Sequence, residues 1–210
     1  MLITMGELVV GKNYQVAIEA VARAKLPHLK YVICGNGPDL ERLKRIAETL
    51  GVSSQVIFLG YRSDIKELLE VADIFLFTSL REGLPRSMME AMASGLPCIA
   101  SKIRGNSDLI SDGVGGFLCN PTDVAAFAHA ITVLTKDREL RHRMGQYNLK
   151  AIADFDVSKV REALVNVYVR EFCGTTTEWS ISQDTGDDGR LFFVLQQSTP
   201  GDAPATESWP

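Results

Sequence analysis

Two glutamates in the stretch REGLPRSMMEAMASGLPCIAS, residues 81–101, have positions from which they could bind a ligand. Glu82 precedes a Gly-Leu-Pro turn, and Glu90 lies inside the helical pattern that follows. Pro85 suits the start of a helix, whose partly positive N-terminus favours a phosphate. Because Glu82 lies before the helix and Glu90 well inside it, they would hold two parts of one ligand rather than act as an acid/base pair on one bond. A carboxylate accepts two hydrogen bonds at once, which suits the vicinal hydroxyls of a sugar. The pattern predicts a ligand of the form sugar, phosphate, sugar.

The same residues also fit a purely structural interpretation, which their spacing does not exclude. Glu82 would then be a partner of the helix dipole, and Glu90 an ordinary exposed glutamate of the helix. The methionines of this helix, Met88, Met89 and Met92, are expected to pack in the core.

The chain as a whole predicts an α/β fold. Up to about residue 118, short apolar runs alternate with amphipathic helical patterns, which is typical of a parallel sheet covered by helices. Strands are expected at 2–5, 31–34, 56–59, 74–78 and 99–101. Helices are expected at 13–24 and 39–50, and a third helix, with its apolar stripe at 65–72, follows Ser63 or Asp64 as its expected cap. Three further helical patterns, at 124–135, 138–155 and 157–172, complete one domain over residues 1–172. We expect a Rossmann-like parallel sheet with helices on both faces.

The first loop, GELVVGKN, leaves the carboxyl end of the first predicted strand, where ligands of open parallel sheets bind. It begins with Gly6 and ends with Lys12, just before a helix that Asn13 is expected to cap. A lysine in this position could hold a phosphate as a point charge. An exposed loop lysine without a ligand is the alternative.

Two later loops, CGNGP and GYRSD, leave the second and third predicted strands. Gly35 and Gly37 lie between strand and helix, but the third glycine of a dinucleotide fingerprint is missing, so binding of NAD or FAD is not supported. Arg62 of the next loop could reach a ligand or remain solvated.

Composition and charge exclude several classes of protein. With 22 basic and 26 acidic residues the formal charge is −4, and no basic face indicates a nucleic-acid partner. The longest apolar runs are far shorter than the roughly 20 residues of a membrane helix, so no membrane span is expected. No secretory signal is visible, so the cytoplasm is the expected location. A partner could bind the protein to the inner face of the membrane. The cysteines lie in separate segments without a C-x-x-C pair, so neither a disulfide framework nor a metal site is expected.

Residues 173–210 differ in composition from the rest of the chain. They are rich in Thr, Ser, Gly, Asp and Pro and show no helical period, so we expect a largely disordered tail. The apolar run at 191–195 could instead add an edge strand or form an aggregation-prone segment.

Several stretches together resemble one family. REGLPRSMMEAMASGLPCIAS is similar to the donor-site signature of the retaining GT-B glycosyltransferases of glycosyltransferase group 1 (family four), in which seven residues separate two glutamates. GELVVGKN before it, the segment VICGNGPDLERL through VADIFLFTS, and SDGVGGFLCNPTD after it resemble the carboxy-terminal domain of that family in the same order. The resemblance covers residues 1 to about 172 and implies one half of a GT-B fold.

The resemblance implies a role for each matching residue. Glu82 would contact hydroxyls of the donor sugar, and Glu90 the ribose hydroxyls of the nucleotide. Lys12, in the loop that begins at Gly6, matches the basic residue that neutralises the diphosphate leaving group. The amides of Gly83 and Leu84 would hold the sugar-phosphate, and Tyr61 and Arg62 would form the wall beside the base. The family's reaction is transfer with retention at the anomeric carbon, and it needs no metal or other cofactor.

Two departures from the family pattern concern charge. Glu7 stands where many relatives have an arginine, and Arg104 is a conceivable substitute for that cation. The stretch RGNSD, which resembles capsule and exopolysaccharide enzymes of the group, replaces the common Gly-Gly-x-x-Glu pattern and leaves Asp108 in the acidic position.

A third departure concerns the size of the chain. A GT-B enzyme has two Rossmann-like domains with the reaction in the cleft between them, and the acceptor-binding amino-terminal domain is absent from this sequence. We therefore expect a donor-binding domain for a nucleotide sugar in polysaccharide or glycoconjugate synthesis that needs a separate acceptor-binding domain or chain. A non-catalytic nucleotide-sugar-binding module and an inactive truncated remnant are the alternatives.

Overall fold

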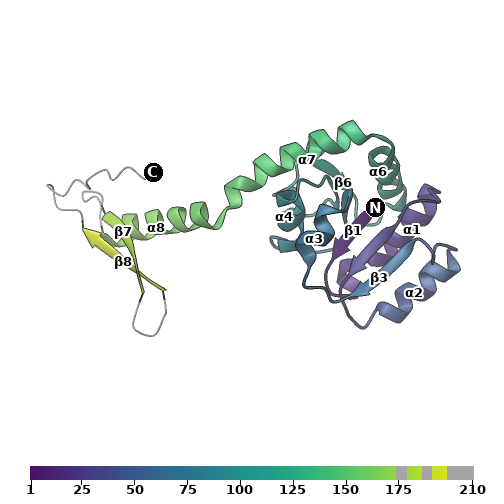
Figure 1. Ribbon diagram of the computed structural model, residues 1–210, viewed down its shortest axis with the longest axis horizontal. Coiled ribbons are helices and arrows are strands. Elements are labelled where there is room, and N and C mark those ends of the chain that lie inside the picture. The colour runs from purple at the N-terminus through teal and green to yellow at the C-terminus, as the bar shows by residue number, and fades with distance from the viewer. Residues whose placement is uncertain (174–178, 186–190, 198–210) are drawn as a thin grey trace. The chain divides into compact units, whose positions relative to one another are not determined.

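Six short parallel strands form one sheet in the computed structural model of the chain, in the order β3-β2-β1-β4-β5-β6 (Figure 1). The strands are β1 (Leu2–Met5), β2 (Tyr31–Cys34), β3 (Val56–Gly60), β4 (Ile74–Phe77), β5 (Cys98–Ser101) and β6 (Gly116–Cys119). The order reverses between β1 and β4, which pair through Leu2 with Ile74 and Ile3 with Phe75. This is the Rossmann-like arrangement that the sequence predicts.

The position of each strand in the sheet explains its burial. The central strands β1, β2, β4 and β5 are buried at every position, as their uninterrupted apolar sequences require when helices cover both faces. At the edge, β3 alternates, and Ile57 and Leu59 are each 37% exposed. One face of β3 is thus only partly covered.

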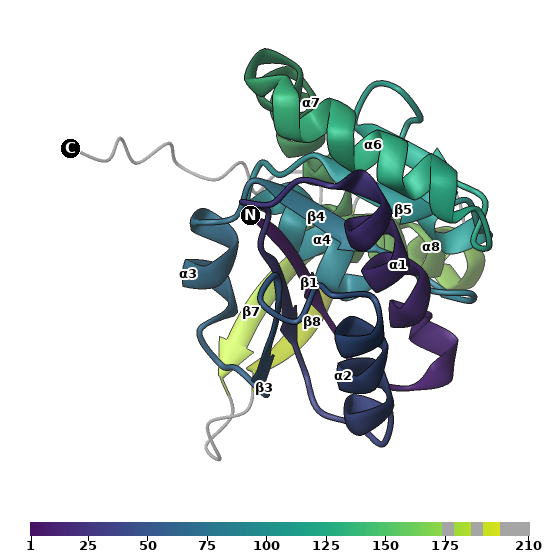
Figure 2. The ribbon, with the colours of Figure 1, turned by 90° about the vertical axis from the view of Figure 1, so that its right-hand side faces the viewer.

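Helices lie on both sides of this sheet (Figures 1 and 2). The helices of residues 1–154 are α1 (Tyr14–Ala24), α2 (Leu40–Thr49), α3 (Ile65–Glu70), α4 (Arg86–Ala93), α5 (Arg104–Ser107), α6 (Val124–Lys136) and α7 (Arg138–Ile152), with the 3-10 turns η1 (Val10–Lys12) and η2 (Ala153–Phe155). In Figure 1, α1 and α2 lie on one side of the strands and α3 and α4 on the other. Further contacts join α6 to α1 and α7 to α4, so two helical layers enclose the sheet.

The structure describes residues 1–173, 179–185 and 191–197, with side chains as far as residue 168. Residues 1–154 form one compact unit and residues 155–210 another. The second unit contains α8 (Val157–Cys173) and an antiparallel pair of strands, β7 (Trp179–Thr185) and β8 (Leu191–Gln197).

The second unit contains the segment that the sequence predicts to be a largely disordered tail, and two stretches of that segment are strands. The apolar run at 191–195 lies within β8, where its backbone groups pair with those of β7 rather than with the main sheet. The rest of residues 174–210 lies outside the described residues. The compact unit ends at Asp154, whereas the sequence places the domain boundary at 172, and that boundary remains a prediction.

Most predicted elements occur within two residues of their expected bounds, whereas β6 and the short α5 are additional. Two predicted helix caps are wrong. Asn13 has a left-handed φ of 54°, and its Nδ2 donates to the Pro121 carbonyl at 2.9 Å instead of capping α1. The Asp64 carboxylate does not cap α3 and instead pairs with Arg62. In each position another partner competes successfully for the side chain: Pro121, distant in the chain, binds Asn13, and Arg62, two residues earlier, binds Asp64.

Direct backbone contact holds the loops after β1 and β2 together. Gly6 N–H donates to Cys34 O at 3.0 Å, and Leu8 N–H donates to Asn36 O at 2.8 Å. A Cβ on Gly35 would overlap the Gly6 carbonyl, and a Cβ on Gly37 would overlap the Leu8 backbone. These two glycines therefore permit close packing of two loops, which explains them without a dinucleotide.

A similar contact fixes the turn that contains Glu82. A Cβ on Gly105, at the start of α5, would overlap the carbonyl oxygen of Gly83. The Leu80 N–H donates to Gly11 O at 2.9 Å, so the same loop is also tied to η1. Helix α5 and η1 thus position the turn from two sides.

Asn148 joins α7 to the sheet. It is fully buried, and its Nδ2 donates to the carbonyls of Leu96 and Gly115, at 2.7 Å each. These carbonyls lie just before β5 and β6, so one side chain links a helix to the start of two strands.

We predict that Gly105→Ala lowers the free energy of unfolding by about 1–3 kcal/mol, because the added methyl group must displace the Glu82–Gly83 turn. Gly11→Ala is the matched control, since a Cβ there meets no atom within 4 Å. Urea unfolding of both variants measures the difference. Equal stability of the two would show that the turn yields without cost.

We predict that Asn148→Ala destabilises the protein by about 1–3 kcal/mol, because the carbonyls of Leu96 and Gly115 each lose a short amide hydrogen bond and keep only a longer one from Cys98. The exposed Gln146 of the same helix provides the control variant Gln146→Ala. Thermal unfolding followed by circular dichroism should separate the two, and a similar midpoint for both would contradict the assigned role.

Candidate functional site

The predicted site residues gather at the carboxyl ends of the strands, around three adjoining hollows. The central hollow, of about 420 Å³, lies between the loop after β1 and the start of α4, next to the reversal of strand order. It is lined by Met5, Gly6, Lys12, Glu82, Leu84, Pro85, Arg86, Ser87 and Glu90. Crevices at this point of an open sheet are where ligands of such folds bind.

The other two hollows share residues with the central one. The Tyr61 hollow, of about 450 Å³, is lined by Met5, Gly6, Glu7, Cys34, Gly35, Asn36, Tyr61, Arg62, Ile65 and Glu90. The Arg104 hollow, of about 900 Å³, is lined by Leu80, Arg81, Glu82, Gly83, Leu84, Ile103, Arg104 and Asp108. Together the three hollows contain every residue that the sequence predicts for the site.

Lys12 and Glu82 form an ion pair in the central hollow. The Lys12 Nζ donates to Glu82 Oε1 at 2.6 Å, and the two side chains are only 26% and 14% exposed. The ammonium group also lies 5.3 Å from the centre of the Phe77 ring, within range of a cation–π interaction. A cation from the loop after β1 and a carboxylate from the loop after β4 thus lie in contact, although 70 residues separate them.

The backbone around Lys12 is anchored from β4. The Thr78 hydroxyl donates to the carbonyls of Lys12 and Asn13, at 3.1 and 3.0 Å. Because Asn13 also binds Pro121, the loop after β1 is held at two points. The Lys12 side chain therefore extends from a fixed base.

Tyr14 forms the floor beneath this loop, and the sequence interpretation did not include it. It is buried, and a Cβ on Gly6 would lie 3.1 Å from its hydroxyl. Burial raises the pKa of Tyr14 far above its usual value, and the nearby charge of Glu82 contributes in the same direction. The phenol stays neutral at physiological pH. Its position two residues after Lys12 was the available signal in the sequence.

Glu90 lies one turn inside α4, where it lines both the central and the Tyr61 hollows. Its carboxylate accepts from Arg86 Nε at 3.0 Å across one helical turn, and its side chain is 39% exposed. Pro85 precedes the first helical residue rather than occupying it, and no side chain of the described residues caps this end. The first amides of α4 are therefore available to an anion at the central hollow.

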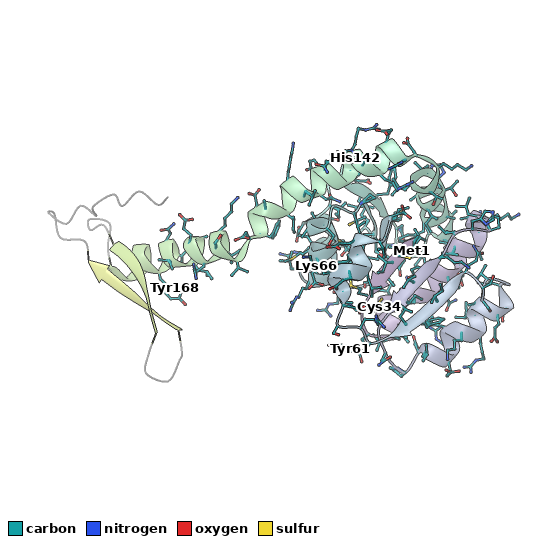
Figure 3. The ribbon with its side chains drawn as sticks, in the orientation of Figure 1. Met1, Cys34, Tyr61, Lys66, His142 and Tyr168 are labelled. Atoms are coloured by element: carbon teal, nitrogen blue, oxygen red, sulfur yellow. The ribbon has the colours of Figure 1, made fainter. Side chains whose placement is uncertain are left out.

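Tyr61 and Arg62 form the outer wall of the Tyr61 hollow. Tyr61 is 79% exposed, and it lies at the same end of the sheet as Cys34 (Figure 3). Arg62 pairs with Asp64, which lowers the pKa of that carboxyl, so Arg62 is neither directed at the central hollow nor simply solvated. Burial raises the pKa of the Cys34 thiol, which makes Cys34 a neutral lining group.

Glu7 and Arg104 lie in different hollows. Glu7 lines the Tyr61 hollow, whereas Arg104 lines the Arg104 hollow with Gly83 and Asp108. The structure therefore does not bring Arg104 to the place of the cation that Glu7 replaces. Arg81, a second arginine of the same hollow, was missed by the sequence interpretation.

None of the helices in the described part of the chain is long and apolar enough to cross a membrane.

Comparison with known proteins identifies the family of the chain. The sequence model of the family described as "Glycosyl transferases group 1" matches residues 1–151. EpsD of Bacillus subtilis (strain 168) is 37% identical over 182 residues, which are 86% of this chain and 48% of EpsD. The Escherichia coli UDP-Gal:alpha-D-GlcNAc-diphosphoundecaprenol alpha-1,3-galactosyltransferase is 32% identical over 145 residues, 69% of this chain and 38% of that enzyme. The chain thus spans half or less of these curated relatives.

Solved structures show the same fold. Anabaena Alr3699/HepE in complex with UDP superposes with a TM-score of 0.75 at 26% identity, over 79% of this chain and 48% of that one. The C-terminal domain of the glycosyl transferase group 1 family protein LpcC from Francisella tularensis gives 0.68 at 26% identity, over 74% of this chain and 86% of that one. By sequence and by fold, the chain belongs to the glycosyl transferases group 1 family.

Proposed function

We propose that residues 1–154 bind the nucleotide sugar donor of a retaining glycosyltransferase. The observation that supports this most strongly is the meeting of Lys12, Glu82, Glu90 and the uncapped start of α4 around one hollow at the reversal of strand order. A cation and a helix N-terminus favour a diphosphate, and two separate carboxylates favour hydroxyl groups on either side of it. A nucleoside diphosphate sugar has this order of groups.

The hollows suggest how such a donor lies. The base would rest in the Tyr61 hollow, beside Tyr61 and Arg62, and Glu90 at the junction would accept hydrogen bonds from the ribose hydroxyls. The diphosphate would lie between Lys12 and the start of α4. The transferred sugar would reach Glu82 and the amides of Gly83 and Leu84. The UDP complex of Alr3699/HepE supports this class of ligand.

The charge needed for departure of the diphosphate would come from the protein itself. Lys12 is preorganised by its ion pair and its anchored backbone, and α4 adds the partial positive charge of its N-terminus. Leaving-group stabilisation by these groups is the reason why we propose that no metal is required. Lys12 must then turn from Glu82 toward the phosphate, which frees the Glu82 carboxylate to accept from the sugar.

We also propose that a separate acceptor-binding domain or chain completes the active site. The chain matches half or less of its curated relatives, yet it covers most of the LpcC C-terminal domain. Sugar transfer by the chain alone would instead show that its own residues bind both substrates.

Binding of UDP, GDP and ADP by isothermal titration calorimetry tests the proposal, with EDTA added to check the metal independence. We expect saturable binding of one nucleotide, weakened at least tenfold by Glu90→Ala because its ribose contact is lost. Glu48→Ala, at an exposed position of α2, is the control. A folded chain that binds none of the three would contradict the assignment.

The Lys12–Glu82 pair makes a second, less obvious prediction. Glu82→Gln should leave nucleotide affinity unchanged or raise it by about threefold to fivefold. In this variant Lys12 does not have to break an ion pair that contributes up to about 1 kcal/mol before it binds the phosphate. Lys12→Gln should lower affinity at least tenfold. The same titrations measure both, and a large loss with Glu82→Gln would show that Glu82 binds the nucleotide itself.

A further inference from the structure

The Arg104 hollow contains charged groups that donor binding leaves unused. Two guanidinium groups, of Arg81 and Arg104, and the carboxylate of Asp108 line it, and all three residues are exposed. In the part of the chain that the structure describes, neither arginine has an ion-pair partner. The remaining charge, that of Glu82, is compensated by Lys12.

The location of this hollow relates it to the second substrate. It shares the turn of Glu82, Gly83 and Leu84 with the central hollow. In the proposed donor arrangement this turn holds the transferred sugar, while the nucleotide extends away toward Tyr61. A molecule bound in the Arg104 hollow would therefore lie next to the sugar that is transferred, where an acceptor has to be oriented.

The chemistry of the lining indicates what the second molecule carries. A guanidinium group matches a phosphate with two parallel hydrogen bonds, and two unpaired arginines around one hollow favour an anion of this kind. Asp108 can only accept hydrogen bonds when ionised, which suits sugar hydroxyls next to the phosphate. The combination fits a phosphorylated sugar better than a neutral glycan.

Two buried polar side chains lie next to the lining residues in the sequence and add a further observation. Ser79 and Asn106 are fully buried, and Ser79 Oγ and Asn106 Oδ1 have no hydrogen-bond partner among the described residues. Ser79 directly precedes the lining residues Leu80 and Arg81, and Asn106 follows Arg104 by two positions. Buried polar atoms nearly always have a hydrogen-bond partner, so these two atoms call for a partner that the described residues do not supply.

We propose that the Arg104 hollow is an acceptor subsite in which Arg81 and Arg104 bind a phosphate group of the acceptor and Asp108 its sugar hydroxyls. This inference rests on the proposed donor function. The phosphate could belong to a soluble sugar phosphate or to a lipid-linked sugar diphosphate, and both have the chemistry that the two arginines recognise.

The test is a nuclear magnetic resonance titration of the full chain, saturated with UDP, with glucose 1-phosphate as the probe. Work at about 0.15 M salt limits unspecific attraction of anions. We expect the amide signals of Gly83 and Gly105 to shift, since Gly83 lines this hollow and Gly105 packs against the Gly83 carbonyl. Glucose, which lacks the phosphate, should bind at least fivefold more weakly.

Single variants separate the acceptor subsite from the donor site. Arg81→Gln and Arg104→Gln should each weaken the probe at least fivefold and change the affinity for UDP less than twofold. Lys102→Gln, which removes an exposed positive charge outside the lining of the hollow, should change neither. Repeating the titration with polyprenyl diphosphate in detergent micelles distinguishes the sources, because tighter binding than that of glucose 1-phosphate would assign the lipid-linked form.

Two results would overturn the inference alone. If UDP binds but the probe does not, or if the probe binds the variants and the control equally, the acceptor subsite is contradicted. An equal loss of UDP affinity in Arg104→Gln would make Arg104 a contact of the donor diphosphate instead. Failure of the unmodified chain to bind any nucleotide would overturn the proposed function, and this inference with it.

Discussion

Backbone contact between loops is the constraint on which the site depends. The strands of a parallel sheet end at one edge, but their loops form a common surface only if they approach one another closely. Glycine makes that possible at Gly35, Gly37 and Gly105, where any side chain would meet the backbone of the next loop. Contacts with neighbouring loops therefore fix the conformations of the Glu82 turn and of the loop after β1, and contacts within each loop contribute less.

Charges around the site compensate one another before any ligand arrives. Lys12 contacts Glu82, Arg62 contacts Asp64, and Arg86 contacts Glu90. A strongly anionic ligand must therefore exchange existing partners rather than find free cations, and the central hollow stays close to neutral without it. Arg81 and Arg104 differ in having no such partner among the described residues, which is why their hollow is of separate interest.

The proposal that a separate domain or chain binds the acceptor rests on the same geometry. The hollows lie at the surface of residues 1–154, and two of them share the turn that contains Glu82. A donor bound there would have one face against the protein, and an enclosed reaction needs cover on the other. Family membership and the match to half or less of the curated relatives agree with this arrangement.

The sequence by itself determined the α/β class, most strands and helices, and the set of loops that form the site, because hydrophobic period and turn residues are local signals. It also indicated Glu82 and Lys12 by their positions in loops after strands, and Glu90 by its position in the helix that follows Glu82. Only the tertiary structure decided that Lys12 pairs with Glu82, that Asn13 and Asp64 do not cap helices, and that Arg104 lies apart from Glu7. Apart from the local Arg62–Asp64 pair, these outcomes depend on contacts between segments distant in the chain, where a side chain binds whichever partner the folded backbone brings nearest.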